Sequence, residues 1–319
     1  MASAAPVTFD RAQLLRDAQI GMAGTPRSLP PKYFYDERGS ELFDEITRLP
    51  EYYPTRAERS LLELYSGKII RESTPRTLIE LGAGSADKTQ YLLNAMIAAS
   101  PSEVTYLPVD VSADFLERSA ERLKTDYPNL RVTPVVADFS APFALPPYPE
   151  PALHAFLGST IGNFTPSAAA TFLMGVRQCM ARADYFLLGA DLRKDVHVLE
   201  RAYNDAQGVT AQFNKNALHV MNAVLGANFD VDRFEHRAVY NGTEHRIEMH
   251  LVSDGAQTVT IPGVGNVLFA DGEYMLTEVS YKYDRATIDE LLTQGGLELL
   301  WWMTDESELF ALALARVRD

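Results

Sequence analysis

The sequence has little of several features that mark large classes of protein. Cys179 is the one cysteine among 319 residues, so no internal disulfide forms, as is typical of the reducing cytoplasm. No stretch reaches the ~18 consecutive apolar residues of a membrane span. The N-terminus, MASAAPVTFDRAQ, lacks a basic segment followed by an apolar one. We therefore expect a cytoplasmic protein with no signal peptide and no membrane partner.

Positive charge is also scarce. Lys and Arg number 29 against 43 Asp and Glu, a formal net charge of −14, and no Lys/Arg-rich run occurs. Proteins that bind the phosphates of nucleic acid need a basic surface, so we expect no nucleic-acid partner. The six histidines show no HExxH or similar spacing, which argues against a metal site. We expect a monomer without an obligate protein partner.

Strand-like and helix-like segments alternate from residue 77 onward. Such alternation is typical of parallel β-α units and predicts an α/β fold with helices on both faces of the sheet. The expected strands are 77–81, 104–111, 131–139, 153–157 and 185–192, and the expected helices are 88–100, 113–127 and 167–181.

The alternation stops near residue 195 and resumes near 284. Between these points we expect one or two helices over 196–226, a hairpin at Asn241-Gly242 and a further strand before Asp271. From residue 284 we expect a helix that ends at Gly295-Gly296, and then the strands 297–303 and 310–317. Residues 26–56, with four tyrosines and two phenylalanines among prolines, are too aromatic for a free tail. We predict two domains: 57–195 with 284–319, and a smaller α+β domain of 1–56 with 196–283.

A glycine-rich turn follows the first expected strand, in "IELGAGSADKT" (79–89). Gly82 and Gly84 allow a tight turn and close approach of a ligand to the backbone. A dinucleotide fingerprint would place a third glycine where this chain has Asp87, so binding of NAD through this motif is disfavoured.

Acidic residues end the next two strands. Asp110 ends the second, and Asp138 ends the third with Phe139 beside it. Ligands of open α/β sheets bind at the carboxyl ends of strands. A carboxylate there can accept hydrogen bonds from both hydroxyls of a ribose. A polar residue next to an aromatic one can hydrogen-bond to an adenine and stack on it. Either acid alone is explained equally well as a helix cap, but three such strand ends together favour a nucleoside site.

These motifs resemble those of class I S-adenosylmethionine (SAM)-dependent methyltransferases, with E-L-G-x-G, then an acid, then D-F at successive strand ends. Within this class, the sequence resembles more specifically the histidine-specific Nα-methyltransferases of ergothioneine biosynthesis. Four segments carry it: "SLPPKYFYDERGSELFDEITRLPEYYPTR" (28–56), "GSTIGNF" (158–164), "RAYNDAQGVTAQFN" (201–214) and "MLTEVSYK" (275–282).

The resemblance implies trimethylation of the α-amino group of L-histidine to hercynine, with S-adenosylhomocysteine (SAH) as the co-product. It implies a Rossmann-like SAM-binding domain and a smaller substrate-binding domain. It assigns residues to three roles: SAM binding by Gly82, Gly84, Lys88, Asp110, Asp138 and Phe139; histidine binding by Tyr52, Asn163, Tyr203, Glu278 and Ser280; and lining of the pocket by Tyr35, Phe43, Thr160 and Met249. Tyr52 and Asn163 are the expected catalytic residues.

Several of the substrate assignments have a simpler alternative. Asn163, in the loop "FLGSTIGNFTP" (156–166), offers donors and an acceptor to the amino acid's polar head, or it stabilises the loop itself. If 274–282 is extended, Glu278 and Ser280 share a face and can meet one imidazole nitrogen, while Tyr52 meets the other. Otherwise Glu278 is a surface residue. Met249 serves the pocket or the core.

Other functions are also compatible with the sequence. Methylation of another amino acid such as tryptophan is disfavoured by Glu278 and Met249. A non-catalytic SAM-binding protein and an NAD-dependent oxidoreductase are the alternatives from other classes. The proton acceptor for the α-ammonium is a tyrosine, a water chain or none, if the neutral amine binds directly.

Overall fold

The computed structural model describes residues 9–83, 88–100, 104–111, 113–137 and 143–318. Gly84, Asp138 and Phe139 lie outside this range. The chain divides into two compact units, which we call the insertion unit (1–53 and 194–280) and the Rossmann-like unit (54–193 and 281–319). The predicted boundaries lie two or three residues from this division. Within the described residues, no helix combines the length and apolar character needed to cross a bilayer.

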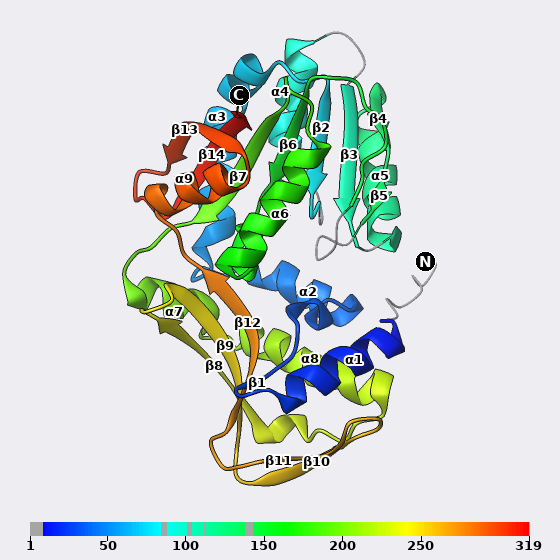
Figure 1. The fold of residues 1–319 in the computed structure, drawn as a ribbon, viewed down its shortest axis with the longest axis vertical. Coiled ribbons are helices and arrows are strands. Elements are labelled where there is room, and N and C mark those ends of the chain that lie inside the picture. Colours follow the sequence, from blue (N-terminus) through cyan, green and yellow to red (C-terminus); the bar gives the residue numbers. More distant parts are fainter. Residues whose placement is uncertain (1–8, 84–87, 101–103, 112, 138–142, 319) are drawn as a thin grey trace. The chain divides into compact units, whose positions relative to one another are not determined.

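The Rossmann-like unit is built on an eight-stranded sheet (Figure 1). The strand order is β13-β14-β7-β6-β2-β3-β4, with β5 also paired to β3. All pairings are parallel except those of β14 with β13 and β7. The strands are β2 Thr77–Leu81, β3 Val104–Asp110, β4 Leu130–Val132, β5 Val135–Val136, β6 Ala152–Phe156, β7 Tyr185–Asp191, β13 Leu297–Thr304 and β14 Phe310–Val317.

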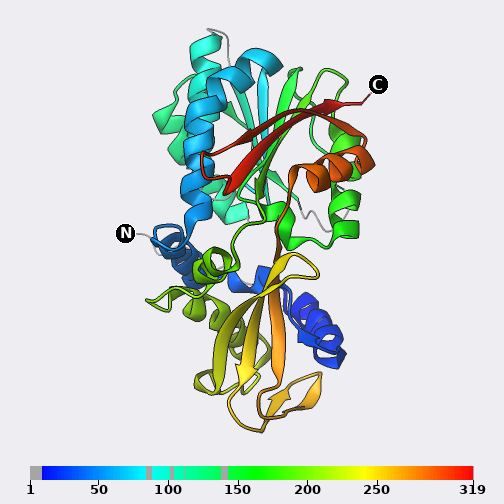
Figure 2. The same ribbon diagram turned by 90° about the vertical axis from the view of Figure 1, so that its left-hand side faces the viewer.

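Helices cover both faces of this sheet, as the sequence predicts. The helices are α3 Tyr53–Ser73, α4 Thr89–Ala99, α5 Ala113–Asp126, α6 Pro166–Cys179 and α9 Arg285–Gln294. One hydrophobic core joins α3, α4 and α5 to the strands, and α6 packs against α9. Figure 2 shows α3 along one face of the sheet and α9 on the other. Thr165 and Asp284 cap α6 and α9 with their side chains, as is typical of helix starts.

One strand prediction is wrong. The expected strand 131–139 is two short strands, β4 and β5, separated at Thr133-Pro134. Pro134 has no backbone N–H to donate to a neighbouring strand, so it interrupts the ladder there. The two final strands, the helix before them and its glycine stop are confirmed.

The insertion unit contains a four-stranded sheet of order β1-β12-β9-β8. The hairpin at Asn241-Gly242 is confirmed, and the region before Asp271 forms two strands rather than one. The strands are β1 Arg27–Ser28, β8 Phe234–Asn241, β9 Arg246–Ser253, β10 Gln257–Ile261, β11 Gly265–Phe269 and β12 Tyr274–Tyr281, and the helices are α1 Arg11–Ala23, α2 Glu37–Ile46, α7 Val196–Tyr203 and α8 Val209–Leu225.

The aromatic N-terminal segment packs as expected. Tyr33 and Phe34 are buried, at 2% and 0% exposed. The Phe34 ring lies 4.8 Å from that of Phe213 on α8. The segment thus belongs to the core of the insertion unit.

Candidate functional site

The carboxyl edge of the Rossmann-like sheet brings two predicted cofactor residues together. Strands β2 and β3 are parallel neighbours in register, with Leu81 opposite Val109. The Gly82 N–H donates to the Val109 carbonyl (2.8 Å), and Gly82 has a φ of 69°, which favours glycine. Half-buried Asp110 ends β3 directly beside this turn.

Lys88 is the N-cap of the next helix, α4, at the same edge. Its ammonium pairs with Glu58 on α3, which is fully buried. A Cβ built on Gly158, in the loop after β6, would lie 3.5 Å from the Lys88 Nζ. A cation therefore stands at the ends of β2 and β6, and the Asp110 carboxylate at the end of β3. This arrangement fits a ligand with a carboxylate at one end and a ribose diol at the other, as SAM has.

A second buried carboxylate lies under this edge. Glu80, 4% exposed, accepts hydrogen bonds from the hydroxyls of Thr89 and Tyr106, each at 2.5 Å. Burial raises the pKa of Glu80 to about 7, against the opposing effects of these two bonds and of Lys88. Glu80 therefore carries its proton over much of the acidic range.

The loop after β6 is tightly held. Ser159 has a φ of 56°, and its hydroxyl accepts from the Asp191 N–H (2.9 Å). The Thr160 hydroxyl donates to the Leu157 carbonyl (2.8 Å). Asn163 ends the short 3-10 helix Thr160–Asn163 and is half-buried. A fixed backbone gives Asn163 a defined position in this unit.

Four of the predicted substrate residues form a continuous row of rings in the insertion unit. Tyr35 lies 5.7 Å from Phe43, Phe43 lies 6.4 Å from Tyr52, and Tyr52 lies 6.1 Å from Tyr203, all edge to face. Phe213 on α8 backs the first two, at 5.3 and 5.8 Å. Edge-to-face packing of this kind fixes ring orientation.

Tyr203 is anchored at both its hydroxyl and its backbone. The hydroxyl donates to the Ser280 Oγ (3.0 Å), and the carbonyl accepts from His236 Nε2 (2.8 Å). His236 Nδ1 in turn accepts from the Asn214 amide (2.8 Å). These partners define the neutral Nε2–H tautomer, and burial lowers the pKa of His236.

Strand β12 carries Glu278 and Ser280 as the extended conformation predicts. Glu278 is half-buried and Ser280 is 4% exposed. Met249, on neighbouring β9, is 2% exposed and lies on the same face of its strand as Ile247 and Leu251, both buried. The core explanation of Met249 is therefore as well supported as the pocket one.

Comparison with known proteins identifies the family. The family model described as "Histidine-specific methyltransferase, SAM-dependent" matches residues 14–317. A curated histidine N-alpha-methyltransferase of Mycobacterium tuberculosis is 46% identical over 95% of this chain and 94% of its own length. The chain belongs to the histidine-specific, SAM-dependent methyltransferases.

More distant relatives of this methyltransferase carry other names. Ergothioneine biosynthesis protein 1 of Schizosaccharomyces pombe is 30% identical over 85% of this chain, which spans 36% of that protein. The L-tryptophan methyltransferase trpM of Psilocybe serbica is 29% identical over 90% of this chain and 88% of its own length.

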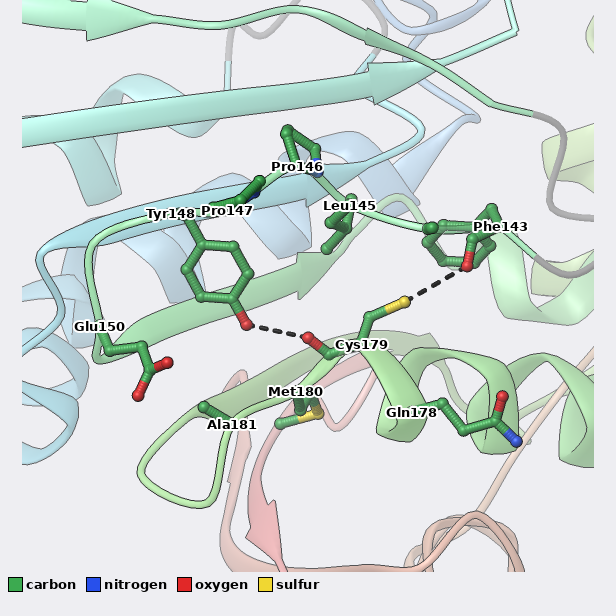
Figure 3. A pocket seen from close by; sticks show the side chains of 11 residues that line it. Phe143, Leu145, Pro146, Pro147, Tyr148, Glu150, Gln178, Cys179, Met180 and Ala181 are labelled. Carbon is green, nitrogen blue, oxygen red and sulfur yellow. Dashed lines mark hydrogen bonds between the residues drawn. The ribbon is translucent and has the colours of Figure 1, made fainter.

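A groove of about 610 Å³ lies elsewhere on the methyltransferase, before β6 and after α6 (Figure 3). It contains none of the predicted site residues. The single proton of the Tyr148 hydroxyl has two acceptors within reach, the Asp184 carboxylate (2.6 Å) and the Cys179 carbonyl (2.9 Å). Burial raises the pKa of the Cys179 thiol, which disfavours a reactive thiolate. The groove is lined by the segments 143–148 and 178–181 with Glu150.

Three residues that contact the predicted site residues or their partners were not predicted from the sequence. Phe213 lies in the segment 201–214 that carries the family resemblance, but no motif marks it. His236 carries no motif. Glu58 did leave a signal, because it occupies a position in the buried stripe of α3 where Ala57 and Leu61 are its neighbours.

Proposed function

We propose that this methyltransferase transfers three methyl groups from SAM to the α-amino nitrogen of L-histidine and so produces hercynine. The match to the histidine-specific family across residues 14–317 carries this proposal. The arrangement on β12 supports it, since Glu278 shares a strand face with Ser280, the hydrogen-bond partner of Tyr203.

Three of the predicted cofactor residues, Gly82, Lys88 and Asp110, lie at the sheet edge described above. SAM supplies a methyl group on a sulfonium that leaves as a neutral thioether, so its departure needs no acid. Lys88 would hold the carboxylate of SAM and Asp110 the ribose hydroxyls, with Gly82 giving the backbone room. Gly84, Asp138 and Phe139 complete the assignment by resemblance.

Selectivity for histidine would rest on Glu278. A carboxylate accepts strongly from an imidazole N–H or imidazolium. Together with Ser280 it would bind one ring nitrogen and Tyr52 would bind the other, while Tyr203 would hold Ser280 in place. Phenylalanine or leucine would offer Glu278 no such donor, and loss of a hydrogen bond to a charged group costs about 1.5–3 kcal/mol.

The remaining requirement is an aligned and neutral amine. Asn163 would fix the polar head of the amino acid, with Thr160 lining the same loop. Alignment of reacting groups removes ~7–11 kcal/mol of barrier at best. Tyr35 and Phe43 would face the growing ammonium, because aromatic faces bind such cations. Tyr52 is a candidate to accept the proton lost before each transfer.

A second candidate is methylation of tryptophan, favoured by the name of the Psilocybe relative. The test is to incubate the protein with SAM and each of the twenty amino acids separately and read product masses. We expect three added methyl groups on histidine alone. Methylated tryptophan in place of histidine would support the second candidate, and no product with any amino acid would contradict both.

We further propose that the protein acts as a cytoplasmic monomer. The composition, with one cysteine and a net charge of −14, supports this. Light scattering coupled to size exclusion should give a mass near 35.4 kDa. A mass twice as large would contradict the monomer, and recovery of the native protein in a membrane fraction would contradict the compartment.

A further inference from the structure

Glu58 is a carboxylate in an apolar setting. It lies on the face of α3 that packs on the sheet, and it is 0% exposed. Burial of an ionised carboxylate is costly unless it is paired and hydrogen-bonded. Both oxygens are in fact used. Oε1 accepts from the Gly158 N–H (2.7 Å), and Oε2 pairs with the Lys88 ammonium.

The strand beneath leaves room for this carboxylate. A Cβ built on Gly189 of β7 would lie 2.2 Å from Glu58 Oε1 and 3.2 Å from the Phe310 ring. Any larger residue at 189 would displace the carboxylate. The position of Glu58 is therefore built into the sheet as well as into α3.

Glu58 joins two loops that the sequence separates widely. Lys88 lies 30 residues from it and Gly158 lies 100 residues from it. These loops follow β2 and β6, which are parallel neighbours in the sheet. One carboxylate thus fixes the ammonium of the predicted cofactor loop and the first amide of the loop that carries Asn163.

A buried ion pair is weak evidence for stability, because apolar residues of similar volume often stabilise a fold as well. We propose that Glu58 is a positioning residue for methyl transfer: it holds Lys88 in place to bind the carboxylate of SAM and fixes the Gly158 loop beside it. This inference rests on the proposed function. It assigns Glu58 no contact with either substrate.

The test measures SAH binding by calorimetry in Glu58→Gln, Lys88→Met and the double variant. Glutamine keeps an acceptor for Gly158 but turns its amide N–H groups toward the Lys88 ammonium. We expect Glu58→Gln to weaken SAH binding ten- to a hundredfold. In the Lys88→Met background the same substitution should change binding less than threefold, because Glu58 acts through Lys88.

A matched control removes an exposed ion pair of the same unit. Glu298 pairs with Arg316 (2.9 Å), and both side chains are about half exposed. Glu298→Gln should bind SAH within twofold of the parent protein. If Glu58→Gln does not fold, Glu58→Asp, which keeps the charge but shortens its reach, takes its place with the same expected direction.

Two results would overturn the inference: SAH binding by the Glu58 variant equal to that of the parent, or an equal loss in the Lys88→Met background. Either would assign Glu58 to the stability of the fold alone. Failure of the parent protein to bind SAH would be a different outcome, because it would contradict the proposed function itself.

Discussion

In the Rossmann-like unit, buried charge holds the predicted cofactor residues in place, whereas in the insertion unit aromatic rings and neutral hydrogen bonds hold the predicted substrate residues. Lys88 pairs with a fully buried glutamate. Tyr203 instead packs on the Tyr52 ring and bonds to Ser280 and to neutral His236. Substitutions of Glu58, Lys88 and Asp110 should therefore act most strongly on cofactor binding, whereas substitutions of Tyr203 and Ser280 should act mainly on recognition of the amino acid.

The largest expected effect follows from Asp110→Ala. Two hydrogen bonds to a charged group, at about 1.5–3 kcal/mol each, predict a loss of roughly a hundredfold or more in kcat/KM. Asp110→Asn, which keeps one acceptor, should lose less. Steady-state kinetics with unfolding midpoints as the control measure this. Activity of Asp110→Ala within threefold of the parent would remove Asp110 from the cofactor site.

Glu278→Gln should lower kcat/KM for histidine by roughly 10- to 100-fold, because the bond to the imidazole loses its charge. Binding of SAH should stay unchanged, which would separate the two units functionally. Glu235→Gln, an exposed residue on β8, is the control. Unchanged histidine kinetics in Glu278→Gln would exclude Glu278 from recognition.

Tyr203→Phe and Ser280→Ala remove the same hydrogen bond from its two ends. A neutral bond is worth about 1 kcal/mol, so each should raise the KM for histidine roughly fivefold. The double variant should be no worse than either single one, because the bond can be lost only once. Additive losses would show that the two side chains act independently.

Glu80 and His236, one in each unit, should make opposite contributions to the pH dependence of stability. Burial raises the pKa of Glu80 to about 7. Its contribution to stability is therefore complete below its unfolded pKa, about 4.3, and is lost as pH rises to 7. Relative to Glu80→Gln, the parent protein should lose unfolding free energy over this range. A pH-independent difference in unfolding midpoint would contradict the assignment.

His236 predicts the reverse trend in the insertion unit, because burial lowers its pKa. Its neutral form contributes stability above the unfolded pKa of about 6.5, and this is lost as pH falls. Relative to His236→Gln, the parent should become less stable from about pH 6.5 downward. Burial also lowers the pKa of His250, which is hydrogen-bonded to Glu248. His250 therefore adds to the acid sensitivity of both proteins but not to the difference between them. An equal response of both proteins to acid would exclude His236 as its source.

Much of the Rossmann-like fold could be predicted because its strands are continuous apolar runs. β2 and β6 are buried at every position and are bounded by turn residues. The interruption of the strand at Pro134 was not predicted, because the residues on both sides of it are typical of a strand. The proximity of Gly82 and Asp110 could be predicted because the carboxyl ends of parallel strands lie at the same edge of a sheet.

The insertion unit was predictable in outline only. The Asn241-Gly242 hairpin has a local signal, but the row of rings from Tyr35 to Tyr203 is assembled from distant segments. Family resemblance assigned those residues where periodicity could not. Glu58 stands out as an acid in the buried stripe of α3, but its partners could not be predicted because they lie 30 and 100 residues away along the chain.

One competition experiment decides whether histidine is the amino acid that the protein trimethylates. The protein is given SAM labelled in its methyl group and an equimolar mixture of all twenty amino acids, and every labelled product is identified by mass. We expect label in histidine alone, ending with three labelled methyl groups on the α-nitrogen. Label in a different amino acid, or none in any, would contradict it.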